Sequence, residues 1–160
     1  MLNSLYVNNV TGDKQKMTTL VHKHLIVRAE VSEPPKDEAL AKEFLKELIE
    51  GINMKILFGP EAKYVDVVGN RGLTCFAIIE TSHVVMHTWD ESDSPMIQLD
   101  VYTCGALDTD VVFDFLRRFG VIKMDYKFLD RENDLKEIAL TGAVVPMRKR
   151  RARKVLQVVS

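Results

Sequence analysis

The chain has 160 residues and a formal net charge of −1 at pH 7, with 46% hydrophobic and 28% charged residues. These values are ordinary for a soluble globular protein of one domain, long enough to bury a hydrophobic core. We find no run of 18 apolar residues and no signal peptide, so we expect a cytoplasmic protein without a membrane span. Two cysteines are too few for a disulfide framework, and a reducing cytosol fits a working thiol.

The chain is expected to divide into a flexible N-terminal arm (residues 1–16), one domain (residues 17–146) and a basic C-terminal tail (residues 147–160). The arm contains turn signals. The tail places six positive charges among the seven residues 148–154. Such short runs are usually solvated or dock on the chain's own acidic surface, so we do not expect a nucleic-acid partner. Residues 155–159 could add an edge strand.

In chain order, the first predicted strand covers residues 24–31, where apolar and polar residues alternate until Pro34–Pro35 ends the pattern. A helix is predicted over residues 36–50, with Gly51 as its stop. Its apolar stripe consists of Leu40, Ala41, Phe44, Leu45, Leu48 and Ile49.

Two short strands, 54–58 and 64–68, are expected on either side of a turn at Gly59–Pro60. A tight connection at residues 69–72 leads into a nearly continuous apolar strand over residues 73–79. We expect this apolar strand to lie inside the sheet and to lead directly into the polar residues that follow it.

The second half again combines strands with one helix. Residues 96–104 alternate, which puts Asp100, Tyr102 and Cys104 on one strand face. A helix begins at Asp108 or Thr109 and runs to about Phe119, with Gly120 as its stop, and residues 121–129 form a last strand. The predicted stripe of this helix is Val112, Phe115, Leu116 and Phe119, and the last strand points Ile122, Met124, Tyr126 and Phe128 inward.

Two β-rich halves that each carry one helix predict an α+β fold. We expect a two-layer sandwich in which helices pack on one face of an antiparallel β-sheet. An exposed second sheet face favours the pairing of two protomers. We interpret Phe58, Tyr64 and Tyr102 as core packing, although each could stack on a ligand.

The side chains best suited to catalysis lie within residues 80–89 and 99–105. Ser82 is a candidate nucleophile, His83 and His87 are candidate acid–base groups, and Cys104 is a candidate proton donor or second nucleophile. On a regular strand, His83 and His87 share one face and Ser82 lies on the other.

Two common kinds of site do not fit this stretch. Ser82 lacks the flanking glycines of an α/β-hydrolase nucleophile elbow. His83 and His87 are four residues apart, which is metal-ligand spacing on a helix but not on a strand, and the glutamate of the helical zinc-protease motif is missing. We therefore expect no metal.

The stretch resembles the self-processing site of the prokaryotic S-adenosylmethionine decarboxylases. In that family a serine–histidine pair precedes a short apolar run, His-Thr-Trp, an acidic loop and an Asp-x-x-Thr-Cys-Gly block. The corresponding segments here are Ser82-His83, Val84-Val85-Met86, His87-Thr88-Trp89, Asp90-Glu91 and Asp100-Val101-Tyr102-Thr103-Cys104-Gly105. The motif covers about 25 residues, while the rest of the chain matches only in length and order of elements.

The resemblance implies an enzyme that makes its own cofactor. The Thr81–Ser82 peptide bond would rearrange to an ester, and elimination would convert Ser82 into a pyruvoyl group. This ketone would form a Schiff base with the substrate amine and act as an electron sink. His87 corresponds to the family's processing base, Cys104 to the thiol that protonates the substrate carbon, and Thr74 roughly to a processing hydroxyl.

The resemblance also implies S-adenosylmethionine as the substrate, for spermidine synthesis, and a homodimer with sites near its interface. Thr81 replaces the family's usual glutamate and stiffens the bond that must rearrange, while Glu80 lies one place earlier. Candidate substrate-binding residues are Glu80, His83 and Asp100. Two alternatives stay open: decarboxylation of ornithine or arginine on the same scaffold, and a non-cleaving homologue that regulates a true decarboxylase.

Overall fold

The computed structural model describes residues 6–8, 14–16 and 21–140. The basic tail and the edge strand expected at residues 155–159 lie outside the described residues. Within the segment expected to be an arm, β1 (Tyr6–Asn8) and β2 (Lys14–Lys16) form a short antiparallel pair.

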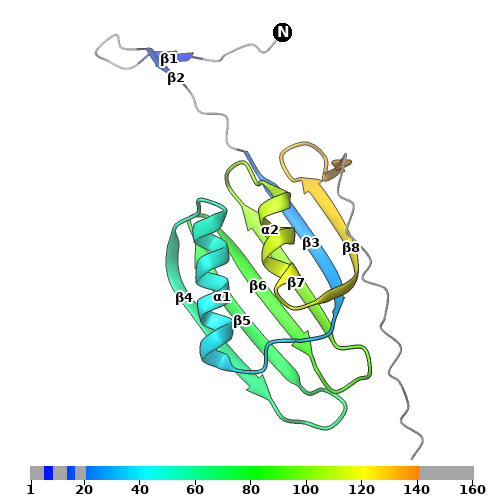
Figure 1. Ribbon diagram of the computed structural model, residues 1–160. Coiled ribbons are helices and arrows are strands. Elements are labelled where there is room, and N and C mark those ends of the chain that lie inside the picture. Colours follow the sequence, from blue (N-terminus) through cyan, green and yellow to red (C-terminus); the bar gives the residue numbers. More distant parts are fainter. Residues whose placement is uncertain (1–5, 9–13, 17–20, 141–160) are drawn as a thin grey trace, which may run out of the picture.

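A seven-stranded antiparallel sheet forms the body of the molecule, in the order β4-β5-β6-β7-β3-β8-β9 (Figure 1). Its strands are β3 (Lys23–Val31), β4 (Ile56–Val65), β5 (Gly72–Ile79), β6 (Ser82–Trp89), β7 (Met96–Thr103), β8 (Val121–Asp130) and β9 (Lys136–Glu137). Strand β3 lies between β7 and β8, so pairing between distant segments joins the two halves of the sheet.

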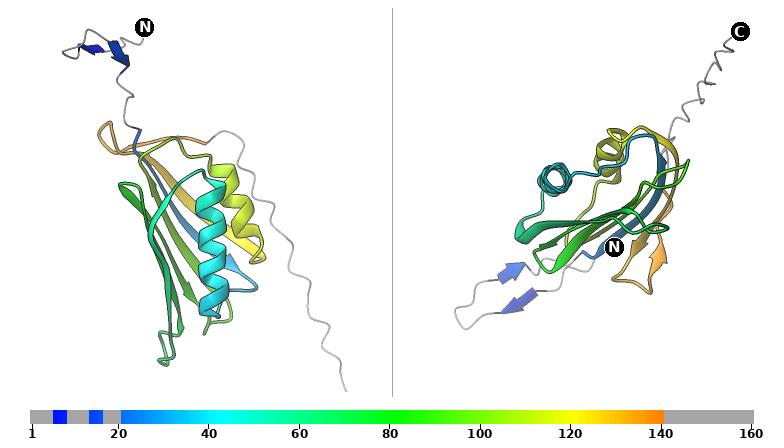
Figure 2. Two further views of the ribbon diagram at one scale, coloured as in Figure 1. Left: turned by 90° about the vertical axis from the view of Figure 1, so that its left-hand side faces the viewer. Right: turned by 90° about the horizontal axis from the view of Figure 1, so that it is seen from below.

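Helices α1 (Glu38–Gly51) and α2 (Thr109–Arg117) both cover the same face of the sheet (Figure 2). Each begins at an aspartate: Asp37 accepts a hydrogen bond from the Leu40 backbone N–H at 2.9 Å, and Asp108 accepts one from Asp110 at 3.0 Å. The predicted two-layer α+β sandwich is confirmed. Neither helix is long and apolar enough to cross a membrane, a finding that covers the described residues only.

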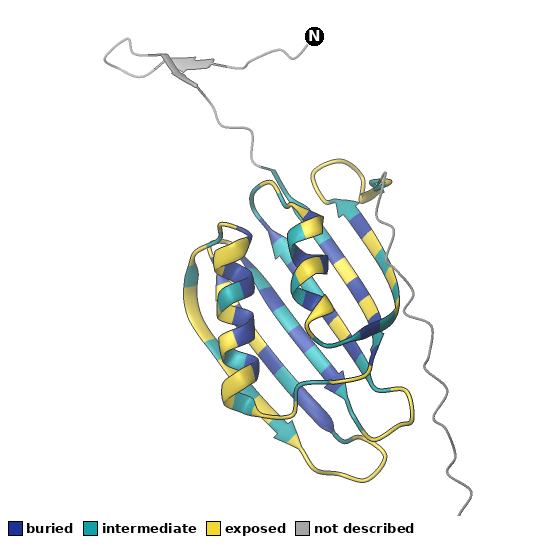
Figure 3. Cartoon of the chain, in the orientation of Figure 1, coloured by how far each residue is buried: buried dark blue, intermediate teal, exposed yellow. Residues whose placement is uncertain are grey.

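The hydrophobic core lies between the helices and the sheet. Buried and more exposed residues alternate along the central strands, as the banding in Figure 3 shows. Burial is essentially complete for Leu45, Leu48, Leu99 and Val101. This alternation confirms the predicted faces of residues 24–31, 83–89 and 96–104.

Three details of the predicted helices are wrong. Leu40 lies outside the buried stripe and is 70% exposed. Gly51 does not stop α1 through a left-handed conformation; Asn53 adopts that conformation, while a Cβ on Gly51 would lie 2.9 Å from the Phe115 ring. In α2, Phe113 is buried, whereas Phe115 is only partly buried and packs with its ring against Phe44 of α1.

The predicted turn at Gly59–Pro60 is also wrong, because both residues lie inside the single strand β4. The pairing of β4 with β5 shifts register between Phe58 and Glu61, which accommodates the irregular backbone. Strand β4 is an edge strand, where a proline without an N–H donor is tolerated.

Candidate active site

The sheet face opposite the two helices, here called the open face, carries most of the polar side chains selected from the sequence. His83 and His87 share this face, as predicted, while Ser82 points to the buried side. The open face contains a cavity of about 390 Å³ whose lining includes both histidines, Arg28 and Asp100.

Ser82 lies directly after a tight turn. Ile79 of β5 pairs with Ser82 of β6, so Glu80 and Thr81 alone connect the two strands. Thr81 adopts a left-handed backbone conformation with φ +54°. The Ser82 hydroxyl donates a hydrogen bond to the Glu80 carbonyl oxygen at 3.1 Å. The candidate nucleophile is therefore held against the backbone of the residue before Thr81.

Cys104 reaches the same carbonyl oxygen from the neighbouring strand. It follows β7, which pairs with β6, and its thiol donates to the Glu80 oxygen at 2.8 Å. Thr103 holds the backbone around Cys104, because its hydroxyl donates to the Gly105 carbonyl at 2.9 Å. The fold thus brings Ser82 and Cys104, far apart in the sequence, to one shared acceptor.

Thr74 and His87 form a second, separate group. They face each other on β5 and β6, and the Thr74 Oγ1 lies 2.9 Å from the His87 Nδ1. His87 is five positions beyond Ser82 on the same strand, a separation of about 16 Å at the usual rise per residue. Within one chain, the two expected processing residues therefore do not meet the candidate nucleophile.

Asp100 joins two histidines at the centre of the open face. Its Oδ1 lies 2.9 Å from the His24 Nε2 and 3.1 Å from the His83 Nε2. Burial by itself would raise the pKa of Asp100, but the hydrogen bonds and charges of His24 and His83 together lower it. The sequence pointed to His83 and Asp100, but not to His24.

Replacing this carboxylate should change the acid sensitivity of the fold. A carboxyl whose pKa is lowered on folding stabilises the native state above its unfolded pKa, here about 3.8, and that contribution is lost as the pH falls through the folded pKa. We expect Asp100→Asn to cost about 1 kcal/mol at pH 7 and less at pH 2. Urea unfolding of both chains at the two pH values measures this; an equal cost at both would contradict it.

Tyr102 lies among several basic groups rather than in the core, which corrects the interpretation as core packing. Its hydroxyl is 2.9 Å from the His22 Nδ1, and the Arg131 guanidinium lies 4.1 Å from the centre of its ring. The rings of His24 and His83 are 5.6 and 5.7 Å away. The alternation in residues 96–104 already placed Tyr102 beside Asp100, but only the pairing of β3 with β7 brings His22 and His24 to it.

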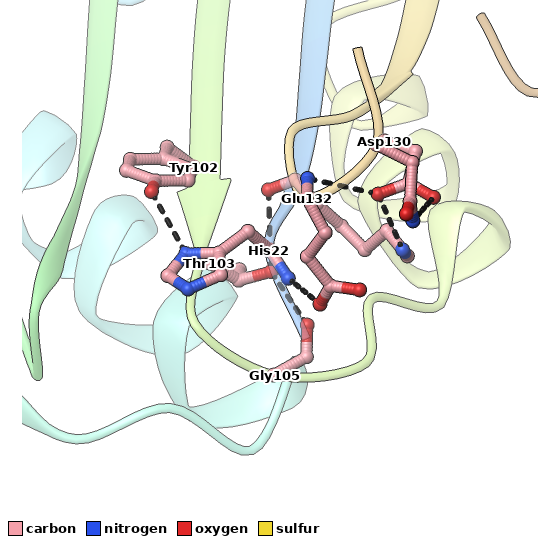
Figure 4. A network of polar contacts seen from close by, with 8 residues as sticks. His22, Tyr102, Thr103, Gly105, Asp130 and Glu132 are labelled. Carbon is pink, nitrogen blue, oxygen red and sulfur yellow. Dashed lines mark hydrogen bonds and ion pairs between the residues drawn. The ribbon is translucent and has the colours of Figure 1, made fainter. Parts of the chain in front are cut away.

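A polar network fixes the ends of these strands (Figure 4). The Glu132 carboxylate accepts from the His22 backbone N–H, and Asp130 pairs with Lys23 at 3.2 Å. A hydrogen bond from Asn133, followed by those from the Glu132 backbone and Lys23, lowers the pKa of Asp130 to about 2. The network ties the start of β3 to the turn after β8, next to Tyr102.

The remaining sequence candidates have smaller parts in this geometry. The Glu80 carboxylate is half exposed and lies 3.6 Å from the Lys55 Nζ. Glu80 contributes to the site through its main-chain oxygen, which accepts hydrogen bonds from Ser82 and Cys104. Tyr64 packs against the core as predicted, whereas Phe58 is exposed. Cys75 is fully buried, which raises the pKa of its thiol to about 11 and separates it from the site.

Comparison with known proteins gives a consistent picture. A family model described as S-adenosylmethionine decarboxylase matches residues 23–132. The chain is 37% identical over 87 residues to an S-adenosylmethionine decarboxylase proenzyme from Pyrobaculum arsenaticum and 36% identical over 88 residues to one from Pyrobaculum neutrophilum. These matches cover 50% and 51% of this chain, and they span only 61% and 62% of the relatives.

The fold has a solved counterpart. The crystal structure of the adenosylmethionine decarboxylase from Aquifex aeolicus VF5 superposes with a TM-score of 0.54 at 19% sequence identity. The superposition covers 71% of this chain and 92% of that structure. At this identity the likeness concerns the fold, and it agrees with one antiparallel sheet covered by helices on one side.

Proposed function

The chain belongs to the S-adenosylmethionine decarboxylase family, and from this premise we propose that it is a self-cleaving, pyruvoyl-dependent decarboxylase of S-adenosylmethionine. The observation that carries the proposal is the meeting of Ser82 and Cys104 on the Glu80 carbonyl oxygen, beside the Thr81–Ser82 bond. In this proposal Ser82 is the precursor of the pyruvoyl cofactor and Cys104 is the proton donor. The product, decarboxylated S-adenosylmethionine, would feed spermidine synthesis.

The local structure fits the formation of a pyruvoyl group at Ser82. The residue begins a strand directly after a two-residue turn, and its hydroxyl oxygen is only four bonds from the Thr81 carbonyl carbon that it must attack, so the attack closes a five-membered ring. A pyruvoyl group here supplies an electron sink for the carbanion left by loss of carbon dioxide. Ser82 holds that group covalently, so no separate cofactor pocket is needed.

Cys104 is the proton donor in this proposal. A thiol S–H can act as a general acid toward a carbanion, which is a far stronger base than the thiolate that remains. Cys104 comes from the strand next to Ser82, and both cysteines in the described residues are free thiols. Because this role requires a reduced thiol, we place the enzyme in the cytoplasm.

We further propose a homodimer that pairs through the open face. Neither helix covers this face, and several large apolar side chains are exposed on it: Ile26 at 41%, Phe58 at 54%, Phe76 at 38% and Ile78 at 47%. A two-fold pairing buries this surface against an identical one. It can also bring His87 of one copy to the exposed β5–β6 turn of the other, which contains the Thr81–Ser82 bond and which His87 of the same chain does not reach.

A chain that lacks His87 should therefore be cleaved when it pairs with a chain that retains His87. We expect His87→Ala alone to slow self-cleavage by about 10²- to 10⁴-fold, as for loss of a general base. When His87→Ala chains are co-expressed with Ser82→Ala chains, a mixed dimer contains one intact Ser82 and one intact His87. Tagged chains and gel analysis should show cleavage of the His87→Ala chain only in the mixture.

Failure of this rescue in proven mixed dimers would contradict action of His87 across the interface. Normal cleavage of His87→Ala chains on their own would remove the processing role altogether. A mixture of wild-type and Ser82→Ala chains is the matched control, because its cleavable chain should be processed at the normal rate.

The direct test of the proposed function is the intact mass of the purified protein under denaturing conditions. Two fragments, residues 1–81 and 82–160, are expected, and the second should be blocked at its N-terminus and reactive toward a carbonyl reagent. A single uncut chain would contradict self-processing and favour the non-cleaving regulatory homologue.

The substrate is tested separately, by carbon dioxide release. S-adenosylmethionine, ornithine and arginine are supplied in parallel to the cleaved protein. We expect release from S-adenosylmethionine. Release only from ornithine or arginine would keep the pyruvoyl chemistry and overturn the substrate, an outcome to which Thr81, in place of the family's usual glutamate, draws attention.

A further inference from the structure

We propose that the left-handed backbone of Thr81 is a built-in strain that accelerates cleavage of the Thr81–Ser82 bond. This inference rests on the proposed self-cleavage and goes beyond it. It gives a positioning role to the residue that departs from the family pattern, through its conformation rather than through a functional group.

Thr81 is in an unfavourable conformation for its residue type. Among the described residues, the non-glycine residues with positive φ are Asn53, Thr81, Asp134 and Leu135, and Thr81 is the one with a β-branched side chain. Its Cβ crowds the following carbonyl oxygen in the left-handed region, and the second branch at Cβ restricts the side chain further. The Thr81 side chain is exposed, so no core packing compensates.

The surrounding structure prevents Thr81 from relaxing. The β5–β6 ladder continues up to the Ile79–Ser82 pair, which leaves two residues for the turn. Glu80 is held at both of its polar backbone atoms: its N–H donates to the Lys55 carbonyl at 3.1 Å, and its carbonyl accepts from Ser82 and Cys104. A two-residue connection with positive φ at its second residue normally takes glycine or asparagine. Fixed neighbours on both sides therefore maintain the strain.

The first covalent step releases this constraint. The Ser82 Oγ forms a bond to the Thr81 carbonyl carbon, the bond from that carbon to the Ser82 nitrogen breaks, and the hydroxyl proton ends on the freed amine. The ester connects Thr81 to β6 through Oγ and Cβ, which lengthens the path by one bond and removes the planar amide. Thr81 can then leave the left-handed region, so the strain is present before the step and declines during it.

The test compares substitutions at position 81 in the full chain. Thr81→Asn accepts the left-handed conformation and keeps a Cβ, so we expect its cleavage to be about 5- to 30-fold slower, the rate equivalent of about 1–2 kcal/mol of lost strain. Thr81→Val retains the β-branch and removes the hydroxyl, so it should cleave at about the wild-type rate. Cleavage is followed by gel after pulse-labelled cell-free synthesis, before cleaved protein accumulates.

Stability supplies the second readout. In chains made uncleavable by Ser82→Ala, we expect Thr81→Asn to raise the midpoint of urea unfolding and Thr81→Val not to. Leu135→Asn is the matched control, because Leu135 is also left-handed, at φ +57°, and exposed, but lies on a different turn. It should raise the midpoint in the same way and leave the rate of cleavage unchanged.

The outcomes separate this inference from the function on which it rests. A wild-type chain that never cleaves would overturn both. A wild-type chain that cleaves, with Thr81→Asn stabilised yet cleaving as fast or faster, would overturn the strain alone. Slow cleavage of both the valine and the asparagine variants would assign the effect to the lost hydroxyl and would also overturn it.

Discussion

Ser82→Ala chains are expected to remain at full length indefinitely and to show no decarboxylase activity. The substitution removes the only atom of residue 82 that can attack the Thr81 carbonyl carbon, so neither the ester nor the pyruvoyl group can form. This is the largest effect that we expect, because it is the loss of a covalent step rather than a change in its rate. Intact mass after long incubation measures it.

The same substitution should leave the fold in place. The Ser82 hydroxyl makes one hydrogen bond to the Glu80 carbonyl, which still accepts from Cys104 when the hydroxyl is gone. We expect a loss of about 1 kcal/mol in the free energy of unfolding. Ser92→Ala is a matched control, because the Ser92 hydroxyl also donates to a carbonyl two residues away, at 2.8 Å, but lies in another loop. Its chains should be cleaved normally; cleavage of Ser82→Ala chains would contradict the site.

Cys104→Ala chains should be cleaved between residues 81 and 82 and yet decarboxylate poorly. In the proposed mechanism the thiol donates a proton only after carbon dioxide has left, so we expect its removal to spare the self-processing of Ser82, while the Glu80 carbonyl keeps its hydrogen bond from Ser82. We expect kcat to fall by about 10²- to 10⁴-fold, the usual contribution of a general acid. Carbon dioxide release, normalised to the content of carbonyl-reactive fragment, separates this loss from incomplete processing.

Cys75→Ala provides the comparison for the thiol. Cys75 is buried between the sheet and α1, where its Sγ lies 3.6 Å from the Ala41 carbonyl, and burial raises the pKa of its thiol to about 11. The substitution should lower stability and leave turnover of the folded enzyme nearly unchanged. Full activity of Cys104→Ala chains, or an equal loss in both variants, would remove Cys104 from the proton-donor role.

Local patterns in the sequence were sufficient for most of the fold. Alternation along residues 24–31, 83–89 and 96–104 identified the correct strand faces, because neighbouring side chains on a strand must point to opposite sides. Helical spacing identified the buried stripe of α1, apart from Leu40 at its edge. The predictions failed where packing overrides local signals, as at Gly59–Pro60, where an edge strand tolerates a proline that would otherwise indicate a turn.

The motif around Ser82 and Cys104 could be recognised from the sequence, because the order and types of its residues are local properties. Their convergence on the Glu80 oxygen could not, since it depends on a main-chain atom and on the pairing of β6 with β7. The same holds for His24, which meets Asp100 only because β3 inserts next to β7, and for the left-handed backbone of Thr81. A sequence specifies which groups are available, but the distances between them arise from hydrogen-bonded pairing of distant strands, which no local pattern encodes.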